Sequence, residues 1–301
     1  MATRLSQPAW LIERWLAEGG PAHATQVAEG YNHPAPLTIR LDGAALDREA
    51  LAARLTAEGA TVQPTAHAPD GLHIESAGSP FAGEAFGAGW WQAQDEASQL
   101  VVLLLDPQPG ERVWDACAAP GGKARYIARR LGETGALLAT DAHEAKARRL
   151  AEGFGGMKRV QVRAHDATTA PSERPFDRVL LDAPCSGLGV MRRHPEIKWR
   201  RTLEDVQARA ALQARLLDAA ARAVRPGGVL VYSVCTETAE EGPDQVARFL
   251  ETHRDFAPET PADADVRWSA LLDAGGALRL RPHLHGADGF FALRLRRKGS
   301  P

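Results

Sequence analysis

Strand-like and helix-like segments alternate along the chain after residue 90, and this alternation constrains the fold more than any other feature. Apolar, β-branched segments of strand length are separated by stretches with apolar residues at helical spacing. Such alternation predicts an α/β fold built on a doubly wound, mostly parallel sheet. The closing residues, 277–297, predict two further strands that close the sheet as a hairpin. The predicted parallel strands are 112–117, 135–141, 160–166, 177–184 and 228–235.

A smaller α/β module precedes this region. The Gly-rich stretch 79–89 predicts the boundary, so we expect a small module over residues 1–85 and a larger domain over residues 86–301. The larger domain is expected to open with a helix over 94–105. The expected elements of the module are a helix around 8–19, a strand at 36–43, a helix at 46–59 and a strand at 71–76.

Composition excludes several classes of protein. Hydrophobic residues make up 44% and charged residues 25% of the 301 residues, as in ordinary globular proteins. The longest apolar run, 100–105, is too short to cross a bilayer, and the first residues lack the pattern of a signal peptide, which predicts a cytoplasmic protein. The three cysteines form no C-x-x-C pair, which argues against structural zinc and a disulfide framework. The formal net charge of −2 means that any contact with nucleic acid needs a local basic patch.

Polar or thiol side chains follow five consecutive predicted strands. Ligands of open α/β sheets bind outside the carboxyl ends of the strands, where these residues are expected to meet. The preference of Asp for turns accounts for one or two such positions but not for the whole series. The sequence therefore predicts one shared site, formed by Cys117, Asp141, Asp166, Asp182, Cys185 and Cys235.

The turn after the first strand, CAAPGGK, indicates the kind of ligand. Its glycines allow close approach of a ligand to the backbone, and the following helix offers free N–H groups. It matches neither the P-loop nor the G-x-G-x-x-G pattern of dinucleotide sites. Asp141 after the second strand can accept hydrogen bonds from ribose hydroxyls. Together these features suit S-adenosylmethionine, and the turn consists of Cys117, Ala118, Ala119, Pro120, Gly121, Gly122 and Lys123.

Read together, the segments resemble the Nop/Sun (Fmu) family of RNA cytosine-5 methyltransferases. The resemblance spans residues 90–297, and the run RRHPEIKW is most like the bacterial branch that acts on small-subunit ribosomal RNA. It implies a class I methyltransferase fold that binds S-adenosylmethionine through residues 117–123, Asp141, Asp166 and Asp182. It also implies that Cys235 is the nucleophile and Cys185 its helper. The matching segments are QDEAS, DACAAPGGK, ATDAHEAKARRL, HDAT, FDRVLLDAPCSGLGVMRRHPEIKW, VYSVC and HGADGFF.

The chain departs from the family pattern at four places. The family's Thr-Cys-Ser around the nucleophile is Val234-Cys235-Thr236, and Ala124 replaces the threonine after the first-turn lysine. Residues 239–242, Ala-Glu-Glu-Gly, stand in place of Pro-Glu-Glu-Asn. The ribosomal branch normally carries a helical RNA-binding domain at its N-terminus, and the segment before residue 36 is too short to form one.

Two thiols fit the chemistry of cytosine methylation. Addition of a thiolate to carbon 6 makes carbon 5 nucleophilic, and a second thiol can assist release of the product. Adjacent parallel strands are about 4.8 Å apart, so Cys185 and Cys235 are expected to face one base. DNA cytosine-5 methyltransferases instead attack with the thiol of a Pro-Cys turn, which would make Cys185 the nucleophile. The presence of both thiols favours the RNA arrangement.

The run MRRHPEIKWRR at 191–201 is the expected RNA contact, because arginines pair with phosphates and an aromatic ring can stack on an unpaired base. A solvated charged loop is the alternative. His283 and His285 are expected to be structural rather than metal ligands, and no metal is expected. The predicted RNA-binding residues are Arg192, Arg193, His194 and Lys198.

The sequence thus predicts an S-adenosylmethionine-dependent RNA cytosine-5 methyltransferase, a monomer acting on small-subunit ribosomal RNA. Two alternatives stay open. One is the same chemistry on transfer RNA. The other is a ribosome-assembly factor that binds RNA and cofactor but has weakened catalysis, which the altered residues around Cys235 allow.

Overall fold

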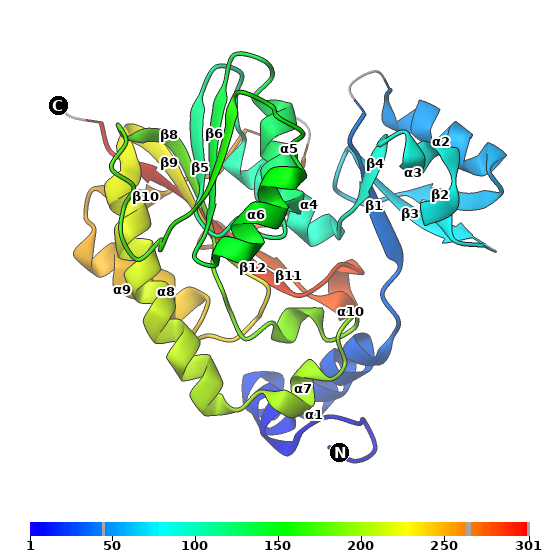
Figure 1. The fold of residues 1–301 in the computed structure, drawn as a ribbon. Helices are drawn as coiled ribbons and strands as arrows, with labels where there is room; N and C mark the ends of the chain where they lie inside the picture. The colour runs from blue at the N-terminus through cyan, green and yellow to red at the C-terminus, as the bar shows by residue number, and fades with distance from the viewer. Residues whose placement is uncertain (44–45, 77, 263–265, 300–301) are drawn as a thin grey trace.

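The computed structural model describes residues 1–43, 46–76, 78–262 and 266–299, which form two sheets with flanking helices (Figure 1). The larger sheet has eight strands in the order β10-β12-β9-β8-β5-β6-β7, and β11 pairs with β12. Its strands are β5 (Arg112–Asp115), β6 (Ala136–Asp141), β7 (Val160–Ala164), β8 (Phe176–Asp182), β9 (Val224–Val234), β10 (Phe256–Pro258), β11 (Ala277–Leu280) and β12 (Phe290–Arg297).

The pairing within this sheet confirms the predicted topology. Strands β5, β6, β7, β8 and β9 pair in parallel, whereas β12 pairs antiparallel with β9, β10 and β11. The predicted terminal hairpin is therefore confirmed, with the short helix α10 (Pro282–His285) inside it. Strand β10 was not predicted, because three residues are too few to show an alternating pattern.

Helices cover both faces of the large sheet, as expected for a doubly wound fold. One face carries α4 (Glu96–Leu105), α5 (Gly122–Arg130) and α6 (Glu144–Glu152), and the other carries α8 (Leu203–Ala223) and α9 (Pro243–Thr252). Helix α4 is buried along almost its whole length because its residues after Gln99 are all apolar. Helix α8 begins with a capping box between Thr202 and Asp205, which satisfies two free N–H groups at its start.

The smaller sheet has the order β2-β3-β1-β4 and is antiparallel. Its strands are β1 (Leu37–Leu41), β2 (Ala60–Pro64), β3 (Gly71–Ser76) and β4 (Trp91–Ala93). Helices α2 (Arg48–Ala57) and α3 (Glu84–Gly87) accompany it, and its core includes Ile39, Leu51 and Trp91. The sequence missed β2 and β4. Strand β4 pairs with β1 although it follows the expected boundary at residue 85.

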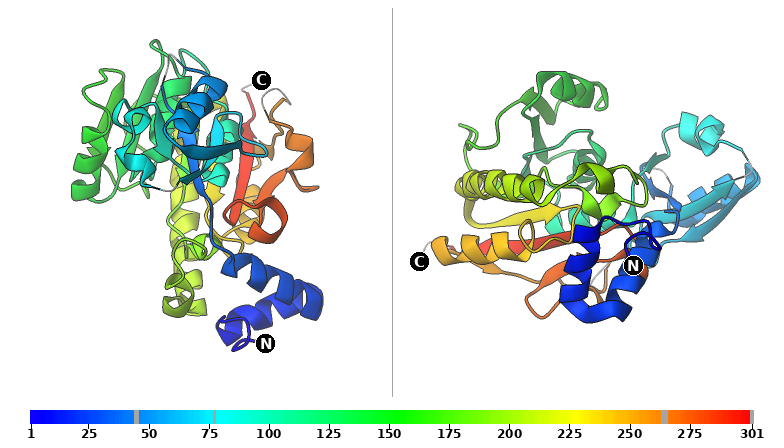
Figure 2. Two further views of the ribbon diagram at one scale, coloured as in Figure 1. Left: turned by 90° about the vertical axis from the view of Figure 1, so that its right-hand side faces the viewer. Right: turned by 90° about the horizontal axis from the view of Figure 1, so that it is seen from below.

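The first helix, α1 (Ala9–Asn32), is longer than predicted and kinked. Gly20 has φ 76° and Pro21 follows it, so the chain bends and then continues as a helix to Asn32. Helix α1 packs through Leu11 and Trp15 on Leu188, which lies in the turn η2 (Leu188–Val190). In Figure 1, α1 lies below both sheets. The left view of Figure 2 also shows α1 at the bottom, apart from the small sheet.

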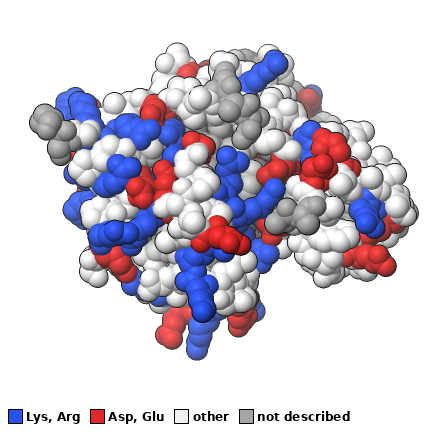
Figure 3. Space-filling view, turned by 90° about the horizontal axis from the view of Figure 1, so that it is seen from above, with Lys and Arg blue, Asp and Glu red and all other residues white. Residues whose placement is uncertain are grey.

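Charges of both signs are mixed on the surface, in keeping with the small net charge. Figure 3 shows Lys and Arg interspersed with Asp and Glu on the face seen from above. Ion pairs also form at the start of the central strands, where Arg178 pairs with Glu111 at 2.5 Å and Arg225 with Asp177 at 2.6 Å. None of the described helices is long and apolar enough to cross a membrane.

Candidate active site

The site lies where the strand order of the large sheet reverses, between β5 and β8. From β5 the chain continues outward through β6 and β7, and then returns to place β8 and β9 on the other side. A crevice at such a switch point is the usual ligand site of an open α/β sheet. The turn after β5 is fixed there because Ala116 N donates to Leu180 O at 2.9 Å and Ala118 N donates to Thr140 O at 2.7 Å.

Glycine is required in this turn for two reasons. Gly121 has φ +115°, which other residues rarely adopt, and a Cβ there would come within 2.6 Å of the Leu150 side chain. Helix α5 begins directly afterwards, at Gly122. The sequence CAAPGGK therefore forms a tight turn that leads into a helix N-terminus, as the glycines predicted.

A cavity of about 210 Å³ lies beside this turn. Most of the predicted cofactor residues of the turn line it, together with Asp182 at the end of β8. Asp141 and Asp166 are not among its lining residues. Their carboxylates accept backbone N–H groups from His143 and Thr168, each at 2.9 Å. The lining residues are Ala93, Gln94, Asp95, Ser98, Asp115, Cys117, Ala118, Ala119, Pro120, Gly122, Lys123 and Asp182.

Negative charge concentrates around this cavity. Burial and the nearby carboxylates of Asp115, Asp182, Asp141 and Asp166 raise the pKa of Cys117 well above its usual value. The thiol of Cys117 is therefore neutral beside the cavity. The site thus favours a ligand that brings positive charge or many hydrogen-bond donors.

Asp115 is the member of this group that sequence reasoning missed. It is 1% exposed, and neither carboxylate oxygen accepts a hydrogen bond of standard geometry among the described residues, although the Cys117 N–H lies close enough to lower the pKa. Burial, together with the charge of Asp182, raises its pKa to about 8. Two buried oxygens without a donor of standard geometry beside a cavity indicate a place for a ligand with donor groups. The sequence could have indicated this residue, because Asp115 is a charged side chain inside the predicted strand, two positions before Cys117.

Lys123 joins the turn to β8. Its Nζ donates to Asp182 Oδ2 at 2.7 Å and to Ser98 Oγ at 3.3 Å. Burial lowers the pKa of Lys123, but the charges of Asp182 and Cys235 and the Asp182 hydrogen bond outweigh this, so the pKa is raised. The other Asp182 oxygen accepts the Ser233 hydroxyl at 2.7 Å. Lys123 is thus a fixed positive charge at the base of the cavity.

The two cysteines that were expected to meet do so. Cys185 follows β8 and Cys235 follows β9, and these strands pair in parallel with Asp182 opposite Ser233. The two Sγ atoms are 3.2 Å apart, which confirms the predicted convergence. The hydrogen bond with Cys235, followed by burial, raises the pKa of Cys185 well above its usual value.

Close backbone contact holds the loop that carries Cys235. Gly189 N donates to Cys235 O at 2.9 Å, and Gly289 N donates to Gly189 O at 2.8 Å. A Cβ on Gly189 would lie 1.9 Å from Gly289 O, so only glycine fits there. The second glycine of the SGLG segment therefore permits contact between the two cysteine-bearing loops and the GADG turn.

The four residues predicted to contact RNA differ in how far their side chains are exposed to solvent. Arg192 donates to Asp288 at 3.2 Å, and Arg193 bridges Asp288 and Asp95 at 2.7 Å each. Lys198 is 7% exposed. The side chain of His194 is 60% exposed. Three of the four are thus engaged inside the protein, where the arginines tie the segment after Cys185 to neighbouring loops.

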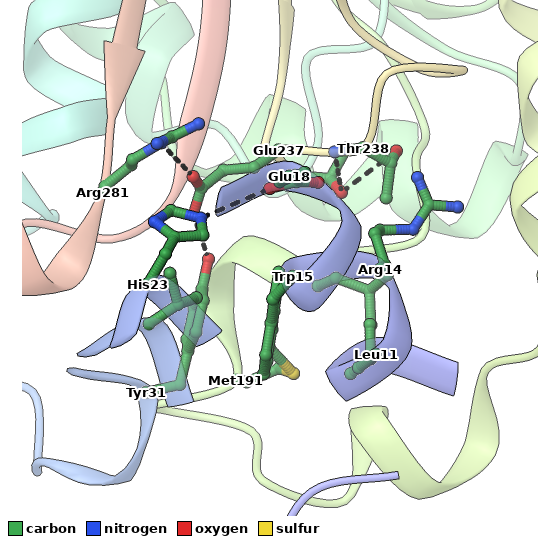
Figure 4. A pocket seen from close by; sticks show the side chains of 13 residues that line it. Leu11, Arg14, Trp15, Glu18, His23, Tyr31, Met191, Glu237, Thr238 and Arg281 are labelled. Atoms are coloured by element: carbon green, nitrogen blue, oxygen red, sulfur yellow. Dashed lines mark hydrogen bonds and ion pairs between the residues drawn. The ribbon is translucent and has the colours of Figure 1, made fainter. Parts of the chain in front are cut away.

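A small second cavity, of about 20 Å³, lies behind the Cys235 loop (Figure 4). Glu237 is central to it, with Tyr31 and Arg281 both pointing toward its carboxylate. Tyr31 donates to Glu237 at 2.5 Å and Arg281 pairs with it at 2.8 Å. Burial raises the pKa of Glu237 to about 7 although both partners lower it. Sequence reasoning missed this contact because Tyr31 and Glu237 are 206 positions apart.

Comparison with known proteins identifies the family. The model of the family described as 16S rRNA methyltransferase RsmB/F matches residues 102–296, and that of its ferredoxin-like domain matches residues 7–80. The chain belongs to the RsmB/F family. This confirms the resemblance found in the sequence, and members of this family are S-adenosylmethionine-dependent methyltransferases of ribosomal RNA.

Individual relatives agree with this assignment. The chain is 34% identical over 303 residues to a probable ribosomal RNA small subunit methyltransferase B from Synechocystis, covering 99% of this chain and 68% of the relative. It is 39% identical to ribosomal RNA small subunit methyltransferase B from Vibrio cholerae, covering 96% of this chain and 65% of the relative.

Solved structures confirm the class I methyltransferase fold. The structure named PH0851 superposes with a TM-score of 0.90 at 31% identity, covering 98% of this chain and 67% of that one. A methyltransferase homologue from Pyrococcus horikoshii superposes with a TM-score of 0.82 at 27% identity, covering 98% and 97% of the two chains. The residues around the larger cavity fit the family's cofactor, because the Gly turn allows close approach and the Asp115 oxygens lack donors of standard geometry.

Proposed function

We propose that the RsmB/F-family chain methylates carbon 5 of a cytosine in small-subunit ribosomal RNA, with Cys235 as the nucleophile. The observation that carries the proposal is the 3.2 Å distance between the sulfur atoms of Cys185 and Cys235, next to the Lys123–Asp182 pair. A paired thiol arrangement of this kind suits covalent catalysis on a pyrimidine ring. The relatives' names supply the class of RNA.

The cofactor would be held by the turn at 117–123 and by Asp182, with Asp141 and Asp166 at the neighbouring strand ends. When bound, S-adenosylmethionine supplies the methyl group. The backbone of the turn and the start of α5 offer N–H groups to its carboxylate. Asp115 offers buried acceptor oxygens toward its donor groups.

Cys235 would act first, as a thiolate. Its sulfur forms a bond to carbon 6, and the ring electrons move to carbon 5, which can then take the methyl group. Lys123, which is paired with Asp182 at 2.7 Å, lies near this thiol. Asp182 would accept the cytosine amino group or hold N3 in its protonated form, which draws electrons into the ring.

Cys185 would act in product release. After methylation the proton on carbon 5 passes to water, the electrons of that C–H bond restore the ring double bond, and the bond between carbon 6 and the Cys235 sulfur breaks. The Cys185 S–H would stabilise the departing Cys235 thiolate. A second sulfur 3.2 Å from Cys235 is placed to assist this step. The target base must first leave its stack to reach either thiol. Exposed His194 and Trp199 are the proposed RNA contacts, and Arg192, Arg193 and Lys198 position the segment that carries them.

The test measures transfer of tritium from labelled S-adenosylmethionine to ribosomal RNA from a deletion strain, followed by bisulfite sequencing. Wild type should label small-subunit RNA at one cytosine, and Cys235→Ala should abolish labelling. A normal rate in Cys235→Ala would exclude the nucleophile assignment. Labelling of transfer RNA alone would make that RNA the substrate. RNA binding without any labelling would instead favour an assembly factor.

A further inference from the structure

Glu241 is a buried carboxylate that the mechanism above does not use. It is 0% exposed and lies beyond the loop that carries Cys235. Its oxygens accept hydrogen bonds from Ser186 N at 2.8 Å, Gln213 Nε2 at 3.0 Å and Thr238 Oγ1 at 3.0 Å. These donors are all neutral, and within the described ranges Glu241 forms no ion pair. The Glu241 carboxylate is therefore buried with neutral hydrogen-bond donors and no ion-pair partner among the described residues, and Arg14 acts on it only at longer range.

This charge lies on the Cys185 side of the thiol pair. Ser186, which donates to Glu241, directly follows Cys185, and Gln213 also donates to the carbonyl of Pro184 at 3.0 Å. Both neighbours of Cys185 in the sequence are thus tied to the same buried cluster. Lys123 lies on the other side, where its positive charge acts on Cys235. The two sulfur atoms are 3.2 Å apart, and the Lys123 ammonium is paired with Asp182 at 2.7 Å, so the Glu241 carboxylate on the Cys185 side makes the difference between them.

Two cations also lie near the Glu241 side of the pair. Arg201 Nε donates to the Ser186 carbonyl at 2.9 Å, and Arg14 interacts with the charge of Glu241, but the charge that shifts the pKa of Cys185 from this side is that of Glu241, which raises it. The Tyr232 hydroxyl donates to the Glu241 backbone carbonyl at 2.5 Å and stays neutral, because burial raises its pKa well above the usual value. The Lys123 ammonium pairs with Asp182 at 2.7 Å. The Arg14 guanidinium pairs with Glu240 rather than with Glu241.

We propose that Glu241 determines which sulfur of the pair carries the negative charge: it keeps the proton on Cys185 and leaves Cys235 as the thiolate. A nearby like charge disfavours ionisation of a thiol, whereas a nearby cation favours it. The hydrogen bond between Cys185 and Cys235, burial, and the charges of Cys235 and Glu241, in that order, raise the pKa of Cys185. The inference rests on the proposed function only in naming Cys235 as the nucleophile. Glu241 is a positioning residue for the proton rather than a catalytic residue.

The chemistry of the pair follows from this order of ionisation. When the two thiols lose their first proton, the proton that remains is bonded to the Cys185 sulfur. The Cys185 S–H then donates a hydrogen bond to the Cys235 thiolate. Cys235, which must attack the base, is thereby deprotonated, and Cys185 stays a neutral thiol that cannot compete as a nucleophile. The alternative order, with attack by the Pro-Cys thiol, would require a thiolate at Cys185 beside a buried carboxylate.

The order can be measured without RNA or cofactor. Purified full-length protein is reacted briefly with iodoacetamide at pH values from 6 to 9, and alkylation of each cysteine is quantified by mass spectrometry of its peptides. In the wild-type protein, iodoacetamide should alkylate Cys235 faster than Cys185 at every pH in this range. Glu241→Gln keeps an acceptor for Ser186 and Gln213 but removes the charge, so Cys185 alkylation should rise about tenfold for each pH unit by which its midpoint falls. The same substitution in a Cys235→Ser background measures Cys185 alone.

Two controls separate charge from structure. Glu240→Gln removes a charge of the neighbouring residue, which pairs with Arg14. Thr238→Val removes a hydrogen bond to Glu241 but leaves its charge. Both should retain the wild-type order. Faster alkylation of Cys185 than of Cys235 in the wild-type protein would overturn the proposal, and this test needs no variant. Unchanged alkylation of Cys185 in Glu241→Gln would also overturn it. Methyl transfer by the Cys235→Ala variant would contradict the proposed role of Cys235 as the nucleophile. It would not change the alkylation result, so the two failures can be told apart.

Discussion

At the scale of single residues, Asp115 is the carboxylate whose protonation the fold changes most. Its pKa is raised to about 8 by burial and by Asp182, so the native protein keeps a proton that the unfolded chain releases near pH 4. Between these two values the native state binds more protons than the unfolded state. The free energy of unfolding should therefore decrease as the pH rises through this window, by about 1.4 kcal/mol per pH unit from this group alone.

Asp115→Asn should remove this dependence. The amide is neutral at every pH, so the stability of the variant relative to wild type should increase steadily from pH 5 to pH 8. Urea unfolding at intermediate pH values measures the difference. Asp244→Asn, at an exposed side chain in the first turn of α9, serves as the control and should show no such trend. A constant difference between Asp115→Asn and wild type would contradict the raised pKa.

Residues that the sequence identified were those carried by local motifs. The two cysteines and the glycine turn were predicted because each sits at a strand end, and strand ends meet at one edge of a sheet. Glu241 and Asp115 were missed because their importance comes from burial, which no short segment reveals. The altered run Ala239–Gly242 retains two acids with distinct contacts, Glu240 to Arg14 and Glu241 to Ser186.

At the scale of elements, α1 supports the loop that carries Cys235. Arg14 binds Glu240 through two hydrogen bonds of 2.8 and 2.7 Å, and Tyr31 donates to Glu237 at 2.5 Å. Two turns of one helix thus hold positions 237 and 240 (Figure 4 shows the Tyr31 contact). Strand and helix alternation predicted the sheet elements, but the docking of α1 depends on contacts between distant positions.

Tyr31→Phe tests this support. The variant leaves Glu237 buried without its hydroxyl donor, which should destabilise the protein by about 1–3 kcal/mol once Glu237 is ionised. Because the pKa of Glu237 is about 7, the loss should be smaller at pH 5.5 than at pH 8.5. Urea unfolding at both pH values measures it. Glu237→Gln is the matched control and should lower the pH dependence. A larger loss at pH 5.5 would contradict the account.

At the scale of the whole molecule, the small sheet is bonded to the helix that follows the cofactor turn. Arg40 on β1 donates to the carbonyl of Gly122 at 3.0 Å and pairs with Asp42 at 2.6 Å. Asp42 also binds Arg125 on α5 at 2.8 Å. The Arg40 guanidinium lies 4.5 Å from the Tyr126 ring centroid. The sequence predicted both α/β units, but this buried ionic contact between them could not be predicted from either alone.

Asp42→Ala should therefore affect both stability and cofactor binding. It leaves Arg40, which is 0% exposed, without its carboxylate, and breaking a buried pair costs about 3–5 kcal/mol. Because Arg40 contacts Gly122, S-adenosylmethionine affinity measured by calorimetry should also decrease. Asp47→Ala, which removes the cap of α2, should cost about 1 kcal/mol and leave affinity unchanged. Equal effects of the two variants would argue against a link between the small sheet and the cofactor turn.

The central claim is that Cys235 attacks the base and Cys185 assists its release, and trapping of the RNA adduct tests this most directly. Labelled small-subunit RNA is incubated with S-adenosylmethionine and each variant, and then run on a denaturing gel. Cys185→Ala should accumulate a covalent protein–RNA band, and the double variant Cys185→Ala/Cys235→Ala should show none. A band that persists in the double variant, or one that forms with Cys235→Ala alone, would contradict the account.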